Sequence, residues 1–284
     1  MIRFLSFLFI ILWSSAFITG KIIVEHGSPF ASLSLRFAIV AAGFLIFSLL
    51  YKERILVKPR NILESALSGI LFHGLYLGGC FYAFSIGVPA SITALIVSMQ
   101  PILTNLLAGP ILNEKVTWRQ WLGIVLGSCG TVLVLGLDVG QSIPKEGIII
   151  TTTSLFAATA GTLWQKKLSG NIPLSVSNFY QAIGASIFLF IIMCIFENPF
   201  IIFNIKFILS MSWQIIAVSF GAFTILMYLI KIRSASKTSN LFFLIPPVSA
   251  LMAWFFLNEK LLINDLIGFA LCSCGVYIAT KKLN

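Results

Sequence analysis

Ionisable side chains are rare in the long apolar runs of this sequence, and Arg36 is the clearest of them. It lies about seven residues into such a run, or roughly 10 Å along a helix that rises ~1.5 Å per residue. An arginine inside a bilayer costs at least ~2.5 kcal/mol on insertion scales, so it needs a partner or water. Arg36 could attract a substrate carboxylate or phosphate. Alternatively, it could snorkel outward or cap the carbonyls of a neighbouring helix.

His73 and Tyr76 are three residues apart, which places both on one face of a helix. His73 is the only side chain inside an apolar run that titrates near neutral pH in its unperturbed state. It could hold a proton or hydrogen-bond a substrate, and the alternative is a neutral histidine bonded to a neighbouring helix. In another run, Trp13 could stack on a planar substrate and Ser15 could offer a hydroxyl. Small residues at such positions also allow close helix packing.

Prolines inside two apolar runs mark candidate hinges, because proline lacks the N–H that a helix interior needs. Pro101 lies in one run, and Pro246 with Pro247 should kink or break another. Irregular backbone at membrane depth is tolerated where it lines a cavity. Polar and aromatic residues on the faces beside these prolines, and in two other runs, are therefore further candidates for substrate contact: Gln100, Thr104, Asn240, Phe243, Trp164 and Tyr228.

The sequence lacks the residues and motifs that several kinds of chemistry require. No Asp or Glu lies deep in an apolar run, and the sequence has no phosphate-binding loop, no His-Glu-x-x-His zinc motif and no nucleophile elbow. The five cysteines lie inside apolar runs without metal-ligand spacing, so we expect packing roles for them. We therefore expect no catalytic residue, no metal and no cofactor.

The composition indicates that lipid is the solvent for most of this chain. Of its 284 residues, 58% are hydrophobic and 10% are charged, whereas a soluble domain carries about 25% charged residues. The net charge of +10 comes from basic residues in short loops, where such residues fix the orientation of a membrane protein. The charge therefore does not indicate nucleic acid as a partner. The expected partners are the bilayer and a small-molecule substrate. A homo-oligomer is compatible with the sequence but has no support in it.

The elements that position these residues are ten apolar runs, each close to the ~20 residues that span a bilayer as a helix. They predict an all-α integral membrane protein, and the runs cover residues 2–24, 29–50, 62–86, 90–112, 118–137, 147–165, 176–196, 213–230, 238–257 and 262–280. With ten spans, fourteen of the 19 Lys and Arg residues fall on one side and four on the other. This bias predicts that both termini are cytoplasmic, in an inner (cytoplasmic) membrane.

The sequence repeats itself after 145 residues. Pro101 meets Pro246 at this shift, and Asn113-Glu114-Lys115 meets Asn258-Glu259-Lys260; residues 90–130 give 15 identities in 41 positions. The chain is therefore expected to consist of two five-span repeats, 1–140 and 146–284. Because five is odd, the second repeat should be inverted in the membrane, which is typical of secondary transporters. The two Asn-Glu-Lys motifs lie at span ends, where we expect a structural role.

The chain resembles the ten-span, EamA-type carriers of the drug/metabolite transporter superfamily. The likeness rests on Leu12-Trp13-Ser14-Ser15-Ala16-Phe17, on Arg36, and on the proline and Asn-Glu-Lys of both repeats. Members of that family export or exchange amino acids, nucleotide-linked metabolites, cofactors and drugs. The resemblance implies a central cavity lined mainly by spans 1, 3, 4, 6, 8 and 9, with spans 5 and 10 as scaffold.

These observations favour a secondary carrier that works by alternating access, and the substrate expected first is an amino acid or amino-acid-like solute. Arg36 suits a carboxylate, while Trp13, Tyr76 and Tyr228 suit an apolar or aromatic side chain. A nucleotide-type cofactor such as S-adenosylmethionine is the alternative, and a lipophilic drug comes third. From other classes of protein, a channel or membrane scaffold stays open. An enzyme is not expected, because no catalytic dyad is visible.

Overall fold

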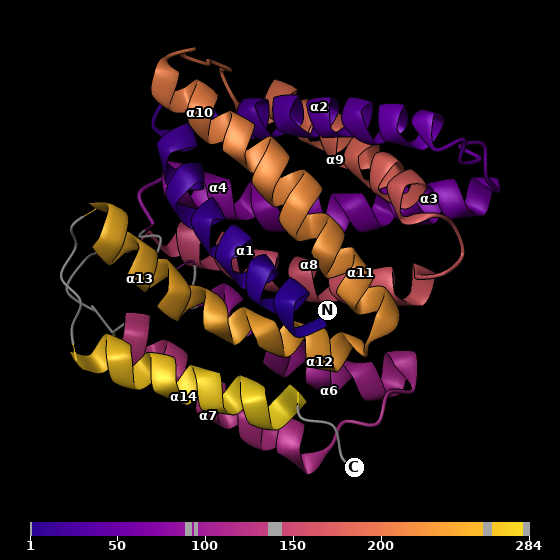
Figure 1. Cartoon of the computed structure of the whole chain (residues 1–284). Helices are drawn as coiled ribbons and strands as arrows, with labels where there is room; N and C mark the ends of the chain where they lie inside the picture. The colour runs from indigo at the N-terminus through magenta and orange to yellow at the C-terminus, as the bar shows by residue number, and fades with distance from the viewer. Residues whose placement is uncertain (1, 89–92, 94–95, 136–143, 258–262, 281–284) are drawn as a thin grey trace.

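The computed structural model describes residues 2–88, 93, 96–135, 144–257 and 263–280 (Figure 1). Most of these residues are helical, and the one β-type contact among them is an isolated bridge between Gly27 and Ile201. Six helices in the described part are long and apolar enough to cross a membrane. The fold is therefore an all-helical bundle of the kind that a bilayer requires, because a helix satisfies its own backbone hydrogen bonds.

The first half of the chain supplies three of these six helices. Helix α1 covers Ile2–Val24 and α2 covers Pro29–Leu50, which are the predicted bounds. The third long helix joins α3 (Pro59–Gly69), the π-helical segment η1 (Ile70–Leu77) and α4 (Gly78–Ser85). After it come two shorter helices, α6 (Gln100–Leu112) and α7 (Trp118–Leu135), where spans 4 and 5 are predicted.

The second half follows the same plan. Helices α8 (Lys145–Leu168) and α9 (Leu174–Phe196) precede a long helix that joins α10 (Ile205–Trp213), the π-helical η2 (Gln214–Phe223) and α11 (Thr224–Ile232). The chain then runs through α12 (Ala235–Ser239), the 3₁₀ segment η3 (Asn240–Leu244), α13 (Ile245–Leu257) and α14 (Ile263–Thr280). Helix α9 begins 145 positions after α2, and a π-helical segment interrupts the third long helix of each half.

The prediction that span 8 begins at Trp213 is wrong, because its helix begins at Ile205. The side chain of Asn204 accepts a hydrogen bond from the backbone N–H of Phe207 at 2.9 Å, which is an N-cap. Asn204, with the polar Lys206 two residues later, marks a helix start in the sequence. Both residues lie outside the apolar run that set the predicted boundary. Span 3 also starts slightly earlier than predicted, at Pro59.

The three predicted hinge prolines lie at the starts of α6 and α13, whereas Pro110 lies inside α6. Pro101 follows Gln100 in the first turn of α6, while Pro246 and Pro247 follow Ile245 in the first turn of α13. Proline is tolerated there because first-turn N–H groups have no intrahelical partner. The irregular backbone predicted near Pro246 lies just before it, in η3.

Helices α7 and α14 pack closely through glycines. A Cβ on Gly123 would lie 2.5 Å from the carbonyl oxygen of Gly275, and one on Gly130 would lie 2.6 Å from that of Gly268. The contact moves backward along α14 as it moves forward along α7, so the two helices run antiparallel. The 145-residue shift carries Gly123 to Gly268 and Gly130 to Gly275, so it exchanges the two contacts.

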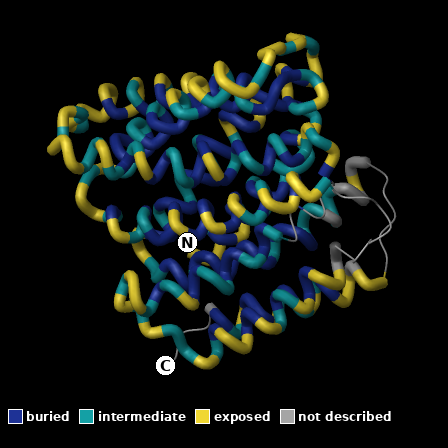
Figure 2. Tube along the Cα trace, turned by 180° about the vertical axis from the view of Figure 1, so that it is seen from behind, coloured by how far each residue is buried: buried dark blue, intermediate teal, exposed yellow. Residues whose placement is uncertain are grey.

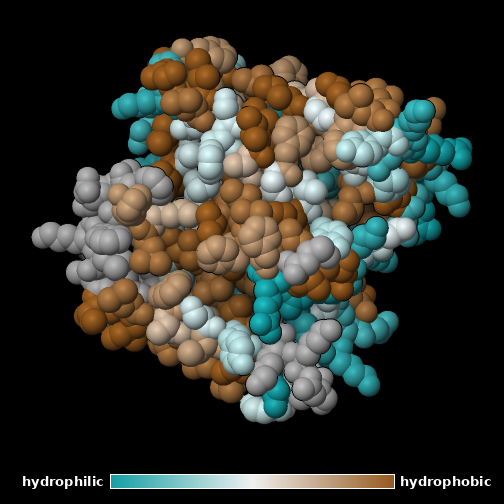
Figure 3. Space-filling view, viewed as in Figure 1, coloured by the Kyte–Doolittle hydropathy of each residue, from teal (hydrophilic) through white to brown (hydrophobic). Residues whose placement is uncertain are grey.

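The face of the bundle shown in Figure 3 is largely apolar, and Figure 2 shows that exposed and buried positions alternate along the helices. Small polar residues are common among the buried positions. Phe4, Leu50, Phe196 and Ile216 are among the large hydrophobic residues that are exposed. Buried aromatic side chains form the interior around Phe9, and many of their ring contacts are edge-on. An apolar exterior of this extent matches a lipid environment.

The Asn-Glu-Lys motif of the first half has a structural role, as predicted from its position. Asn113 ends α6 in the left-handed conformation, with φ at 54°. The carboxylate of Glu114 accepts hydrogen bonds from the backbone N–H of Ala235 at 2.8 Å and from the hydroxyl of Ser236 at 2.9 Å. Glu114 therefore caps α12 and ties the two halves together. The second motif, residues 258–260, lies outside the described residues.

Glu197 joins the end of α9 to the first turn of α2, and its ionisation gives a testable pH dependence. Its carboxylate accepts hydrogen bonds from the backbone N–H groups of Phe30 at 3.0 Å and Ala31 at 3.1 Å. Burial raises the pKa of Glu197, an effect that these hydrogen bonds only partly offset. Because the folded protein binds this proton more tightly than the unfolded chain does, the contribution of Glu197 to stability falls as pH rises through that raised pKa.

We expect the wild-type protein to lose stability relative to Glu197→Gln as pH rises above the ordinary glutamate range. The difference should stay below about 1 kcal/mol, because the carboxyl group is half-exposed and screened. Thermal unfolding of both proteins in detergent between about pH 4 and pH 8 would measure it, since ordinary glutamate titrates near the lower limit. A difference that grows in the opposite direction would contradict the assignment.

Candidate binding site

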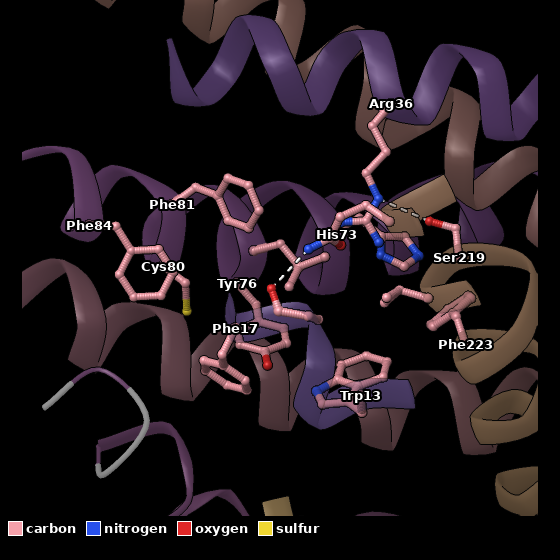
Figure 4. Close-up of a pocket in the computed structure, with 14 residues that line it drawn as sticks. Trp13, Phe17, Arg36, His73, Tyr76, Cys80, Phe81, Phe84, Ser219 and Phe223 are labelled. Carbon is pink, nitrogen blue, oxygen red and sulfur yellow. Dashed lines mark hydrogen bonds between the residues drawn. The ribbon is translucent and has the colours of Figure 1, made fainter. Parts of the chain in front are cut away.

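A pocket with about 530 Å³ of empty space, including its mouth, lies between helices from both halves of the chain (Figure 4). Only about 40 Å³ of this space admits the centre of a water-sized sphere, far below the ~300–1,000 Å³ of typical ligand pockets, so the site would have to widen to admit a ligand. Helices α1 and α2 and the η1–α4 segment supply one part of the wall, and η2 supplies the rest. The lining extends from Trp13 and His73, near the middle of their helices, toward Phe84, close to the end of α4.

Arg36 carries the only cationic group among the residues that line this pocket. Its side chain reaches in from α2, and its Nε donates a hydrogen bond to the hydroxyl oxygen of Ser219 at 3.0 Å (Figure 4). The residue is 3% exposed, and its guanidinium carbon lies 5.2 Å from the ring centroid of Phe37. Over the residues that the structure describes, the one ion pair joins Arg60 and Glu64, so no carboxylate neutralises Arg36.

The π-helical segment η1 presents His73 and Tyr76 to the pocket, so these two predicted residues do share a face (Figure 4). The His73 ring lies 4.5 Å from the ring centroid of Phe37 and 4.3 Å from that of Phe223. Its Nδ1 is buried and has no hydrogen-bond partner among the described residues. The π-helical turns are rare and concentrate at functional sites, which agrees with their presence on both sides of this pocket.

Aromatic rings form most of the wall. Trp13 and Phe17 come from α1, Phe81 and Phe84 from α4, and Phe223 from η2 (Figure 4). Such rings provide a large apolar surface for a ligand body. Trp13 was predicted from the sequence, whereas these four phenylalanines were not.

Gln214 and Ser219 are polar lining residues that were not predicted from the sequence either. The Gln214 amide nitrogen donates to the carbonyl oxygen of Ala16 and to the hydroxyl of Thr19, both at 2.9 Å. Its amide oxygen is buried without a partner in the described part of the chain. Both residues interrupt the apolar stretch 205–232, which was the available signal, but their five-residue spacing shares a face only in a π-helical turn.

Other predicted site residues lie away from this pocket. Ser15 faces α10, where its hydroxyl donates to the carbonyl oxygen of Leu12 at 2.7 Å and accepts from the indole N–H of Trp213 at 2.8 Å. Gln100 donates to the hydroxyl oxygen of Thr162 at 2.8 Å, on α8. Thr104 is fully buried one turn further along α6.

Asn240 belongs to a buried hydrogen-bond network instead of the pocket wall. The Asn105 amide donates to the side-chain oxygen of Asn240 at 3.0 Å, and Gln120 donates to that of Asn105 at 3.4 Å. This network joins α6, α7 and η3, so its evident role is to fix the helices around the 3₁₀ segment. The Asn240 amide nitrogen has no partner among the described residues.

Phe243 packs against α7, where a Cβ on Gly127 would lie 2.6 Å from its ring. The neighbouring Phe242 lines a second, smaller pocket with Trp13, Tyr76 and Pro246. Trp164, on α8, and Tyr228, on α11, are not among the residues that line either pocket. The ammonium group of Lys167 lies 5.9 Å from the Trp164 ring centroid.

Comparison with known proteins identifies the class of molecule to which this bundle and pocket belong. The model of the EamA-like transporter family matches the chain twice, over residues 2–136 and 145–281. The uncharacterized transporter YyaM of Bacillus subtilis (strain 168) is 30% identical over 96% of this chain and 91% of its own length. A probable amino-acid metabolite efflux pump of Salmonella typhimurium is 23% identical over 97% of this chain and 93% of its own length.

A solved crystal structure has the same fold, with a TM-score of 0.82 over 98% of this chain and 96% of the other, at 20% sequence identity. The helical bundle, its apolar exterior and these matches define a transmembrane transporter. The chain belongs to the EamA-like transporter family, within the drug/metabolite transporter superfamily.

Proposed function

We propose that this transporter is a secondary carrier that exports or exchanges an amino acid or amino-acid-like solute. The observation that carries the proposal is Arg36, a buried cation at a pocket wall with no described carboxylate to neutralise it. A buried charge without a counter-charge is costly, so an anionic ligand group would relieve the cost. Two relatives, from Salmonella typhimurium and Escherichia coli, are named probable amino-acid metabolite efflux pumps, which supports this substrate class.

The proposal includes a ten-span architecture of two inverted five-helix repeats. Helices of corresponding type recur about 145 residues apart, and both third helices carry a π-helical segment. Helices α7 and α14 are equivalent under this shift yet run antiparallel, as members of oppositely oriented repeats must. Inverted repeats give a carrier two related gates around one site, which is what alternating access requires.

We further propose that both termini are cytoplasmic and that the protein lies in the inner membrane, from the distribution of Lys and Arg. The pocket would then lie in the outer half of the bundle, since it extends along α1 and α4 away from the N-terminus. Contacts near the inner ends of the helices would hold the inner half closed. Lys166 donates to the carbonyl oxygens of Ile230 and Arg233, and Glu114 caps α12. The structure would thus represent an outward-facing state.

Counterflow in liposomes tests the proposed function. The purified protein is loaded with an unlabelled solute, and entry of the labelled solute is followed for amino acids, nucleotides and methyl-donor cofactors. A carrier should show saturable, transient accumulation of one solute class. Flux that rises linearly with concentration and shows no counterflow would indicate a channel, and the proposal would then be wrong.

Breaking the Glu114 cap should loosen the inner closure. We expect Glu114→Ala to raise the rate at which a thiol reagent labels Ala108→Cys, because Ala108 is fully buried beside Leu163 and Ala235. A lost N-cap costs ~0.5–2 kcal/mol, which predicts a rate increase of roughly 2- to 30-fold. The background would have the exposed Cys129, Cys194 and Cys274 replaced by serine. Glu64→Ala, which breaks an exposed ion pair, is the matched control and should leave the rate unchanged.

A further inference from the structure

The described residues of the pocket wall carry positive charge but no negative charge, which restricts the charge of the ligand that the pocket can bind. Fourteen described residues line it, and they include one permanent cation, Arg36, and no Asp or Glu (Figure 4). A zwitterionic amino acid would bring an ammonium group together with its carboxylate. The carboxylate would find Arg36 and the hydroxyl of Ser219, but the ammonium would find no counter-charge in the wall.

Neutral groups in the pocket would compensate an ammonium only in part. The unpartnered amide oxygen of Gln214 can accept two hydrogen bonds, whereas an ammonium group has three N–H donors to satisfy. The aromatic rings of the wall attract cations through their faces, but none of them carries the negative charge that would neutralise an ammonium group. Arg36 also repels any second cation across a low-dielectric interior, where charges interact more strongly than in water.

We propose that the site selects an organic monoanion, with a carboxylate at Arg36, an aromatic or apolar body against the ring wall, and no charged amine. This inference rests on the proposed function and narrows its substrate class to amino-acid-like acids whose nitrogen is absent or uncharged. The Gln214 amide oxygen suits a neutral N–H or O–H on such a ligand, because it is a buried acceptor without a donor. The ligand would bring the local charge to zero, which neither a zwitterion nor an amine does.

Four probes with a common phenyl body isolate the effect of charge. They are 3-phenylpropionate, N-acetylphenylalanine, phenylalanine and 2-phenylethylamine, and each is tested by thermal stabilisation in detergent and by counterflow in liposomes. We expect the two monoanions to half-saturate at concentrations at least about tenfold below that of phenylalanine, a difference that corresponds to one decade in affinity. The amine should neither bind nor exchange. Binding of phenylalanine that equals or exceeds that of both monoanions would overturn the inference.

Arg36→Gln provides the second readout. If Arg36 is the origin of the preference, this variant should bind the monoanions more weakly and bring them close to phenylalanine. A preference for monoanions that survives in a folded variant would contradict the assignment to Arg36. The carrier function and the preference for monoanions can be refuted separately. Monoanion binding in detergent without counterflow would refute the carrier but keep the binding site, while saturable counterflow that favours phenylalanine would keep the carrier and refute the monoanion.

Discussion

Arg36→Gln should abolish most transport of carboxylate-bearing solutes. The substitution removes the only cation of the pocket wall, and a hydrogen bond to a charged group contributes about 1.5–3 kcal/mol. The half-saturating concentration in counterflow should therefore rise by roughly 10- to 150-fold. Arg36→Lys should recover only part of the activity, because a lysine ammonium cannot reproduce the planar, forked geometry of a guanidinium group.

The control for this result is Arg60→Gln. Arg60 is exposed and pairs with Glu64 at 2.8 Å, so its loss removes an equal charge outside the pocket. Counterflow should be unchanged in this variant, since exposed pairs contribute ~0–1 kcal/mol. Unaltered counterflow in a folded Arg36→Gln protein would show that Arg36 is structural, and the binding site would then have to be sought elsewhere.

Gly69→Ala should be severely destabilising. The added Cβ would overlap the backbone carbonyl of Gln181, because α3 and α9 approach closely at this point. Gly184, on α9, faces the backbone of Ala66 in the same way, with a prospective Cβ 2.6 Å from its carbonyl oxygen. Overpacking costs typically ~1–3 kcal/mol, and more where backbone must move. We expect a clear drop of the unfolding temperature in detergent and a low yield of folded protein.

The same substitution at Gly109 provides a matched comparison. A Cβ there would have a single neighbour, the carbonyl oxygen of Glu114 at 3.8 Å, which is an ordinary contact. Alanine is favoured over glycine in a helix by ~1 kcal/mol, so Gly109→Ala should be neutral or stabilising. Equal effects of the two substitutions would mean that the α3–α9 approach is looser than the structure shows.

Much of the fold could be predicted from hydropathy, since lipid forces each spanning segment to be a long apolar helix. Helices α1 and α2 end where their apolar runs end. The start of α10 was missed because it depends on one capping side chain, Asn204, and not on average hydropathy. The π-helical segments could not be predicted either. A single extra residue within a helical turn leaves no pattern in a sequence whose flanking residues are all apolar.

Residues that line the pocket could be predicted where the side chain is costly to bury, and they were harder to predict where it is not. Arg36, His73, Tyr76 and Trp13 all line the pocket. Large polar or aromatic groups stand out in lipid-spanning helices, because burying them there is costly unless they serve a site. Ser15 and Gln100 do not line the pocket, since the hydrogen bonds of a hydroxyl or amide group are satisfied as easily by a neighbouring helix. Phe242 was missed in favour of Phe243 because the 3₁₀ turn of η3 changes which side of the helix each residue faces.

The π-helical segments also bear on how the pocket could change shape. A turn that holds one residue more than an α-helical turn can move along its helix, and the residues that it passes then rotate by roughly 100° about the axis while both ends of the helix stay in place. In η1 such a step would carry His73 and Tyr76 around their helix while the ends of α3 and α4 kept their places. In η2 it would do the same to Ser219 and Phe223. Each half of the bundle therefore contains a segment that can twist in this way, and the two segments face each other across the pocket.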